Sequence, residues 1–321
     1  MKNSSSGYIY IVLCALIFST MEVMLKVVHG IFAPMQITMI RFLIGGILLI
    51  PFAMRSMKEK GVSFDSRDIP FFALTGFLCV SFSMVLYQMA ITYTKASVVA
   101  LIFSSNPIFV TVLAHLILHE AIHLNHVAAL VIEVIAITVI VSPWNTQLSL
   151  TGVLLSVAAA VVFALYGVVG KKRTGKYGGI AVTCFSFVLG GTELLLLLLL
   201  GKIPAIAAFY RGIGLSIFAE VPILTRIPLS AVPAFLYICI VNSAAGFVCH
   251  MKAFEKTSAQ EASLIFFLKP MIAPIIAYVF LHEDIPLNMI IGIILFLIGS
   301  GISVIPGIVK LRRAKAQEAS E

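Results

Sequence analysis

The chain has 321 residues, of which 60% are hydrophobic and only 11% charged, and its formal net charge is +8. Soluble proteins usually carry about a quarter of their residues as Asp, Glu, Lys or Arg, so too few charges are present to cover a water-facing surface. This composition excludes a soluble enzyme, a nucleic-acid-binding protein and a disordered chain. At about 20 residues per crossing, the apolar content is enough for about ten membrane helices.

Apolar runs of membrane-spanning length follow one another along the chain. They do not alternate as barrel strands do, and backbone in lipid must satisfy its own hydrogen bonds, so we interpret them as α-helices of an all-α integral membrane protein. The ten predicted helices cover 7–28, 34–52, 69–92, 97–118, 124–141, 150–170, 179–201, 232–253, 258–281 and 288–309. The first run is too long for a signal peptide and nine comparable runs follow it.

One stretch, 203–230, does not fit this series. It is long and partly apolar, which leaves an eleventh span open. Arg211, Glu220 and two nearby glycines interrupt it, so an interfacial helix or a loop is the favoured interpretation.

Lys and Arg are distributed unequally between the two sets of connecting segments. With the N-terminus inside, the inner segments hold fifteen of them and the outer segments hold four. Cytoplasmic loops of membrane proteins carry such an excess. We therefore expect a multi-pass plasma-membrane protein with both termini, including the tail 310–321, in the cytoplasm.

Metal, cofactor and disulfide chemistry is not indicated. The five cysteines all fall inside apolar runs, are odd in number and lack C-x-x-C spacing. The dipeptides His119-Glu120 and His282-Glu283 are not followed by the second histidine that a helical zinc motif requires. We expect no bound metal and no cofactor.

The first half of the chain is repeated in the second half. An offset of 163 residues aligns Ala90, Thr94, Ala96, Pro107 and His119-Glu120 with Ala253, Thr257, Ala259, Pro270 and His282-Glu283. Apolar bias alone would align leucines, but not proline or His-Glu. A weaker match, at an offset of 145, aligns Phe18 and Lys26 with Phe163 and Lys171.

The repeat defines two five-helix halves, 7–141 and 150–309. Because five is odd, the second half enters the membrane from the opposite side. Inverted repeats of this kind are typical of transporters that alternate between two openings around a site at the midplane.

These motifs resemble the drug/metabolite transporter superfamily, EamA type, over nearly the whole chain. The resemblance is carried by Phe18-Ser19 with Lys26, by Ile40-Arg41-Phe42, by the junction Ala90…Thr94…Ala96-Ser97 and by the two Pro…His-Glu segments. It implies ten helices, two EamA repeats, and export or exchange of small metabolites. It also implies that helices carrying Phe18, Tyr87, Phe103, Tyr166 and Phe266 line the cavity. Lys269 departs from the pattern, since many members have an acidic or neutral residue there.

Several ionisable residues are predicted inside the membrane. Glu22 and Arg41 fall about 10 Å below the outer ends of helices one and two, which favours a Glu22–Arg41 pair, with Lys26 as a competing partner. Such a cluster either joins the two helices or acts as a gate or proton-coupling site. Glu193, in the outer half of helix seven, is expected to pair or to titrate.

The predicted substrate site lies at the midplane. Lys269 falls about 16 Å into helix nine, and Pro270 is expected to break this helix as Pro107 breaks helix four. We predict that Lys269 binds a carboxylate or phosphate, and the alternative is a structural ion pair, for example with Glu133. The other predicted site residues are Asn106, Asn242, Ser105, Tyr87, Phe18 and Phe266.

The leading functional hypothesis is a secondary transporter of small polar metabolites such as amino acids or other carboxylates, with a proton as a possible coupling ion. The chain contains no P-loop that would couple ATP. Efflux of amphipathic or cationic compounds is the alternative, disfavoured by Lys269 unless this lysine is paired. A lipid enzyme is less favoured, since no nucleophile or metal cluster is evident, and so is a channel, since no charged ring lines one pore. A monomer and a homodimer are both compatible with the sequence.

Overall fold

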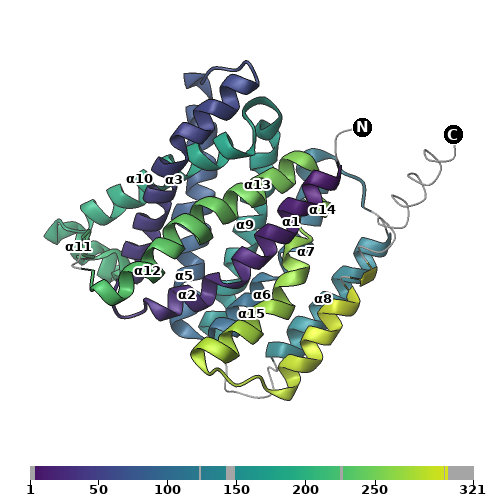
Figure 1. Ribbon diagram of the computed structural model, residues 1–321. Helices are drawn as coiled ribbons and strands as arrows, with labels where there is room; N and C mark the ends of the chain where they lie inside the picture. The colour runs from purple at the N-terminus through teal and green to yellow at the C-terminus, as the bar shows by residue number, and fades with distance from the viewer. Residues whose placement is uncertain (1–3, 123, 142–148, 225–226, 300, 303–321) are drawn as a thin grey trace.

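A computed structural model describes residues 4–122, 124–141, 149–224, 227–299 and 301–302 (Figure 1). These residues contain eight helical rods that are long and apolar enough to cross a membrane. Two shorter apolar helices, Val127–Ile140 and Leu287–Gly299, lie where helices five and ten are predicted. The expectation of an all-α, multi-pass membrane protein is therefore confirmed, and the count of ten membrane crossings stays a prediction. The tail 310–321 lies outside the described residues.

The helices of the first half follow the predicted order. They are α1 (Ser4–Ser19), α2 (Met21–Val27), α3 (Pro34–Glu59), α4 (Ile69–Gly76), η2 (Phe77–Met84), α5 (Val85–Tyr93), α6 (Ala96–Phe103), α7 (Asn106–Leu118) and α8 (Leu124–Val141). Three of the predicted spans are composite, because α1 and α2, then α4 to α5, then α6 and α7 each follow one another closely.

The second half repeats this series. It comprises α9 (Leu150–Tyr177), α10 (Gly179–Leu200), α11 (Pro204–Gly212), α12 (Val232–Leu236), η5 (Tyr237–Ala245), α13 (Gly246–Lys256), α14 (Ala259–Ala262) and α15 (Ile265–Leu281). Short 3₁₀ turns cover Ser66–Asp68, Ser216–Phe218 and Leu229–Ala231. The segments η2 and η5 are both π-helical and occupy equivalent places in the two halves.

Two helices extend beyond their predicted ends, so the predicted limits at residues 52 and 170 were wrong. Helix α3 continues to Glu59 and α9 to Tyr177. The extension of α9 is held by Asp68, whose carboxylate lies 2.9 Å from Arg173 and 2.8 Å from Lys176. Helix α9 can continue past its apolar run because these ion pairs with Asp68 stabilise the polar end of the helix.

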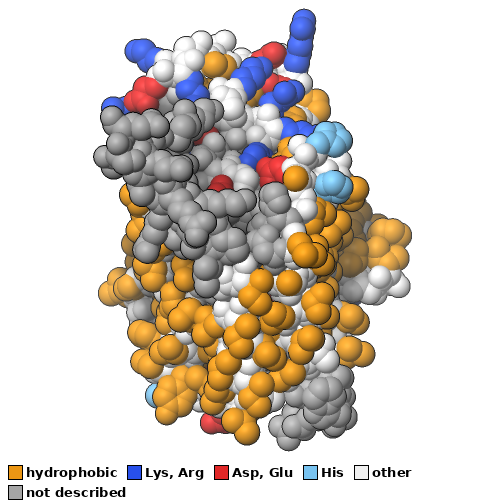
Figure 2. All heavy atoms as spheres, turned by 90° about the vertical axis from the view of Figure 1, so that its right-hand side faces the viewer, with side chains coloured by type: hydrophobic (Ala, Val, Ile, Leu, Met, Phe, Trp, Pro, Cys, Tyr) orange, Lys and Arg blue, Asp and Glu red, His pale blue; other side chains and the backbone are white. Residues whose placement is uncertain are grey.

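Charge and apolar surface are separated along the molecule. On the face shown in Figure 2, hydrophobic side chains cover the middle, whereas Lys, Arg, Asp and Glu gather at one end. In Figure 1, the C-terminal end of α3 and the start of α1 lie toward this same end. A lipid-facing belt with a charged cap is what the sequence predicts for the cytoplasmic end.

The stretch 203–230 contains no further span among its described residues. Helix α11 has nine residues, less than half the length needed to cross a membrane. After it the chain turns back, and the Glu220 amide donates to the carbonyl of Gly201 at 2.9 Å. The described residues of this stretch thus form a short helix followed by turns, and its place at the membrane interface stays a prediction.

Small residues let the two halves pack closely. Helix α10 packs against α3 and α4, and a Cβ added at Gly76 would lie 2.5 Å from the Gly190 amide nitrogen. Gly46 similarly approaches Val188. The glycines at 292 and 299 contact α8 in the same way. These small residues therefore serve packing within one chain.

We expect Gly76→Ala to destabilise the protein by about 1 to 3 kcal/mol, since the added methyl would meet backbone that cannot move aside. Gly175→Ala is a matched control, because Gly175 lies in α9 with no atom within 4 Å of the added carbon. It should stabilise by roughly 0.5 to 1 kcal/mol. Thermal unfolding in detergent measures both, and equal shifts would contradict the proposed close contact.

Candidate functional site

Helical hydrogen bonding is interrupted in the middle of several spans. Thr20 separates α1 from α2, Ser104 and Ser105 separate α6 from α7, and residues 263–264 separate α14 from α15. The π-helical segments η2 and η5 add two further irregular places. Such features are frequent at functional sites of membrane proteins, where freed backbone groups line or support a cavity.

Asn242 supports the interruption at Thr20. Its side-chain nitrogen donates to the Ile17 carbonyl and to the Thr20 hydroxyl, both at 2.9 Å. The Tyr237 hydroxyl lies 3.0 Å from the same Thr20 oxygen. Asn242 is buried and its side-chain oxygen has no hydrogen-bond partner among the described residues. The side-chain nitrogen of Asn242 thus holds helix α1, and its side-chain oxygen is available to accept a hydrogen bond.

The interruption between α6 and α7 lies next to Pro107, as predicted. Helix α7 begins at Asn106, and the Asn106 amide donates to the Ala160 carbonyl at 2.9 Å. The Ser105 hydroxyl donates to the Ile102 carbonyl at 2.7 Å. Both predicted site residues are buried and support the break rather than line the cavity.

The predicted break at Pro270 was wrong. Helix α15 runs through Pro270, and the break falls earlier, at residues 263–264. Ser258 and Glu261 form a capping box at the start of α14, which fixes a four-residue turn before the chain bends. The lost hydrogen bond at Pro270 is tolerated inside a helix whose neighbours pack tightly around it.

Lys269 forms an ion pair with Glu22, and both side chains are 1% exposed. The predicted Glu22–Arg41 pair was therefore wrong, as was the alternative that Lys269 pairs with Glu133. Glu133 is buried in α8 without a hydrogen-bond partner in the described part of the chain. Lys26, one turn after Glu22 on α2, makes no ion pair among the described residues and lines a hollow with Thr94 and Glu283. Helix rotation, which depth along a helix does not specify, decides these partners.

A small cavity lies beside the Lys269 side chain. Its volume is about 10 Å³, and its lining comprises Lys269, Phe18, Met21, Met84, Tyr87, Phe103, Phe163 and Phe247. The ammonium lies 5.1 Å from the ring centre of Phe103 and 5.7 Å from that of Tyr87. This space is about enough for one water molecule. Of the predicted aromatic residues, Phe18, Tyr87 and Phe103 line it.

Equivalent aromatic residues of the two repeats meet at this cavity. Phe18 aligns with Phe163, and their ring centres lie 6.4 Å apart; Phe103 aligns with Phe266, at 5.8 Å. Phe266, a predicted site residue, thus packs behind the lining. The charges do not follow this symmetry, because Gly167 aligns with Glu22 and Asn106 with Lys269. The repeats build a common aromatic frame, and individual positions supply the charges.

Arg41 is fully buried in α3 and forms no ion pair with the described residues. Its three side-chain nitrogens have no hydrogen-bond partner among the described residues. The guanidinium carbon lies 4.5 Å from the ring centre of Phe42. Tyr87, whose hydroxyl is also without a partner there, is within electrostatic range of both Arg41 and Glu22. Arg41 therefore stands beside the ion pair as an additional positive charge.

Glu193, another predicted site residue, lies apart from this cluster. It is half-buried in α10, and its carboxylate accepts a hydrogen bond of 3.2 Å from Ser81. This places it against η2, not in the central cavity.

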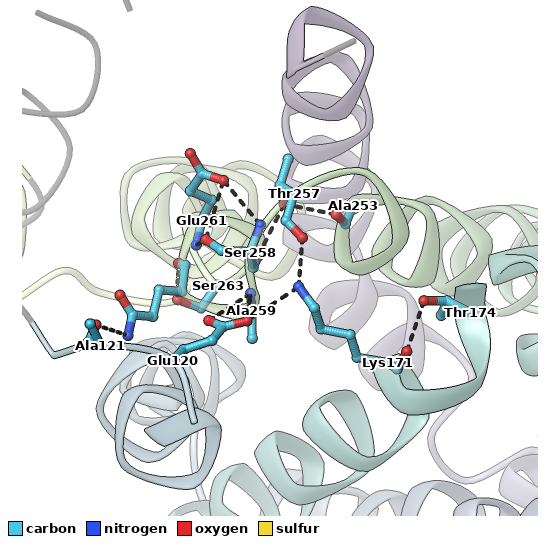
Figure 3. A network of polar contacts seen from close by, with 11 residues as sticks. Glu120, Ala121, Lys171, Thr174, Ala253, Thr257, Ser258, Ala259, Glu261 and Ser263 are labelled. Carbon is cyan, nitrogen blue, oxygen red and sulfur yellow. Dashed lines mark hydrogen bonds and ion pairs between the residues drawn. The ribbon is translucent and has the colours of Figure 1, made fainter. Parts of the chain in front are cut away.

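A polar network joins the end of α7 to the start of α14 (Figure 3). The Glu120 carboxylate accepts hydrogen bonds of 3.1 Å from the Ala259 amide, and it lies 3.3 Å from the Lys171 ammonium. Lys171 also donates to the Thr257 carbonyl at 2.6 Å. We name Glu120, Lys171, Thr257 and Ala259 the Glu120 cluster.

The equivalent residues meet at the opposite end of the same two spans. Glu283 accepts from the amides of Ala96 and Ser97 at 3.0 and 3.1 Å, and from the Ser97 hydroxyl at 2.6 Å. We name Glu283, Lys26, Thr94 and Ala96 the Glu283 cluster. The doubled His-Glu motif is now explained: each histidine ends its helix in the left-handed conformation, and each glutamate binds the first turn of the other repeat's helix.

The two clusters differ in their lysines. Lys171 is bound to Glu120, whereas Lys26 makes no ion pair within the described residues. Lys26, Thr94 and Glu283 instead line an open hollow of about 390 Å³. The sequence alignment already pairs these residues, but it contains no signal that one cluster is closed and the other open.

Comparisons with known proteins give a consistent assignment. The EamA-like transporter family matches residues 5–142 and again 150–305. An uncharacterized transporter of Clostridium kluyveri is 36% identical over 92% of this chain and 91% of its own length. A probable terminal-alkyne amino-acid exporter of Streptantibioticus cattleyicolor is 26% identical over 71% and 70%. A solved crystal structure shares the fold with a TM-score of 0.67 and 15% identity, over 94% of this chain and 97% of the other.

Proposed function

Because the chain belongs to the EamA-like transporter family, we propose that it moves small carboxylate-bearing metabolites, such as amino acids, by alternating access. It is a membrane transporter, and the proposal concerns its substrate, its mechanism and its place in the plasma membrane. The observation that carries the mechanism is the pair of equivalent clusters, of which one is closed by a lysine and the other is open.

Alternating access follows from exchanging the two arrangements. In inverted repeats, each half can adopt the conformation of the other, so that the opening moves to the opposite side of the membrane. Here Lys171 would leave Glu120 and Thr257, while Lys26 would bind Glu283 and Thr94. On the orientation that the charge excess favours, the Glu120 cluster lies at the cytoplasmic end. In this proposal, the described state is closed toward the cytoplasm, and the hollow at the Glu283 cluster faces outward. Driving energy comes from a gradient or from counter-exchange.

The centre favours anionic or zwitterionic substrates over cations. Lys269 is neutralised by Glu22, which removes one objection to a cationic substrate. Arg41, however, leaves the buried centre with one uncompensated positive charge. Since a second cation there would be repelled, cation efflux is the weaker alternative.

Cysteine accessibility tests the proposed exchange. The native thiols are buried except Cys249, which is half-buried, so Cys249→Ser provides the background. Thr94→Cys and Thr257→Cys are matched reporters at equivalent positions of the two clusters. With a membrane-impermeant maleimide on right-side-out and inside-out vesicles, Thr94→Cys should react quickly from outside, whereas Thr257→Cys should be protected.

Two lysine variants then test the balance between the two arrangements of the clusters. Lys171→Met removes bonds of the closed cluster, so the rate at Thr257→Cys should rise at least tenfold from the cytoplasmic side while that at Thr94→Cys falls. Lys26→Met is the control and should leave both rates near their original values, because Lys26 makes no ion pair in this state. Fast labelling of both reporters at once would indicate a continuous pore and contradict alternating access. Unchanged labelling rates of both reporters in Lys171→Met would also contradict alternating access.

A further inference from the structure

Arg41 is the strongest unexplained feature of the buried centre. It is 0% exposed, and all three of its side-chain nitrogens are without a hydrogen-bond partner among the described residues. A guanidinium carries five N–H donors and stays charged in proteins. Leaving such a group unpaired away from water costs several kcal/mol, whereas nearby Lys269 and Glu22 satisfy each other.

The Glu22 carboxylate lies within electrostatic range of Arg41 but forms its ion pair with Lys269. Helix α3, which carries Arg41, packs against both π-helical segments, η2 and η5. The Phe42 ring beneath the guanidinium packs against Phe247 at 5.4 Å, and Phe247 lines the central cavity. Arg41 is thus one layer behind the cavity wall, beside Tyr87.

We infer that Arg41, and not Lys269, binds the carboxylate of the transported molecule. The guanidinium matches a carboxylate with two parallel hydrogen bonds, which a lysine ammonium cannot offer. The Tyr87 hydroxyl and the free Asn242 oxygen supply further polar contacts, and the aromatic frame receives the apolar part of the substrate. This assignment rests on the proposed transport function, because the cavity of about 10 Å³ must widen before a carboxylate reaches Arg41.

Ligand-induced thermal stabilisation of the purified full chain tests the assignment. The probes are matched pairs that differ only in the acidic group: sodium propanoate with propanamide, sodium 3-phenylpropanoate with 3-phenylpropanamide, and L-phenylalanine with L-phenylalaninamide, all at equal ionic strength. In the wild type we expect the acids, but not the amides, to raise the unfolding temperature. In Arg41→Gln the apparent affinity for the acids should fall at least tenfold.

A second measurement separates binding from a structural role. Without ligand, Arg41→Gln should unfold at the wild-type temperature or above it, because an uncompensated buried charge is removed. Arg41→Lys should retain part of the response, and the exposed Arg55→Gln all of it. A large loss of stability in unliganded Arg41→Gln, equal stabilisation of the wild type by acids and amides, or no stabilisation by any acid would overturn the assignment.

The failure of this inference is distinguishable from the failure of the transport proposal. If the cysteine reporters exchange accessibility but acids do not bind, the chain is a transporter without a carboxylate site at Arg41. If acids bind through Arg41 but the reporters do not exchange, the site exists and alternating access is wrong.

Discussion

Lys269→Met alone is expected to destabilise the protein by about 3 to 5 kcal/mol, because it leaves the Glu22 carboxylate buried without its counter-ion. Glu22→Gln should have a similar cost, since it leaves the lysine ammonium unpaired. The double variant removes both charges and should recover most of the lost stability. Such non-additivity is the evidence that the two residues act as a pair.

Thermal unfolding of the four proteins in one detergent measures this cycle. We expect the midpoint to fall by on the order of 10 °C in each single variant and by much less in the double variant. The exposed pair of Arg55 and Glu59 provides a matched control, for which the corresponding variants should leave the midpoint nearly unchanged. Additive losses in the double variant would show that each residue has a separate role.

Glu283→Ala is expected to cost about 3 kcal/mol, because the carboxylate holds two backbone amides and one hydroxyl at the start of α6. The two amides belong to Ala96 and Ser97, which are buried, whereas Glu283 itself lines the open hollow. Glu120→Ala should have a comparable cost, since Ala259 and Lys171 both lose their acceptor.

The two glutamate variants should differ in conformation rather than in stability. Glu120→Ala removes the partner of Lys171, so labelling of Thr257→Cys from the cytoplasmic side should increase. Glu283→Ala removes no lysine contact of the described state and should leave this labelling unchanged. Glutamine at either position retains an acceptor oxygen and should restore part of the stability. Equal labelling in both alanine variants would argue against distinct closed and open clusters.

The sequence predicted the frame of the protein well. Membrane helices are determined by length and apolar composition, which are local properties, and the described helices follow the predicted order. The repeat was detectable because proline and His-Glu align at one offset, and both halves match the same family. The helix ends were less accurate, since the ion pairs of Asp68 that extend α9 lie far apart in the sequence.

For the candidate site, the sequence indicated which charges are buried but not which of them pair. Glu22, Arg41 and Lys269 were recognisable as buried charges because ionisable residues are rare in membrane spans. Their pairing was not, since depth along a helix says nothing about its rotation, and Glu22 turns toward α15 instead of α3. The break in α1 at Thr20 had only a weak signal in the adjacent hydroxyl residues, and its support comes from Asn242, more than 200 positions away.

By itself the sequence determined that this chain is a membrane protein of two related halves, because hydrophobic length and internal repetition are properties of the chain alone. Only the tertiary structure decided which buried charges are satisfied and which of the two equivalent clusters is closed. The physical reason is that a charge in a low-dielectric interior is governed by contacts of a few ångströms. Those contacts arise from how the separate helices rotate and bend against one another, and they leave the Arg41 guanidinium without a hydrogen-bond partner among the described residues.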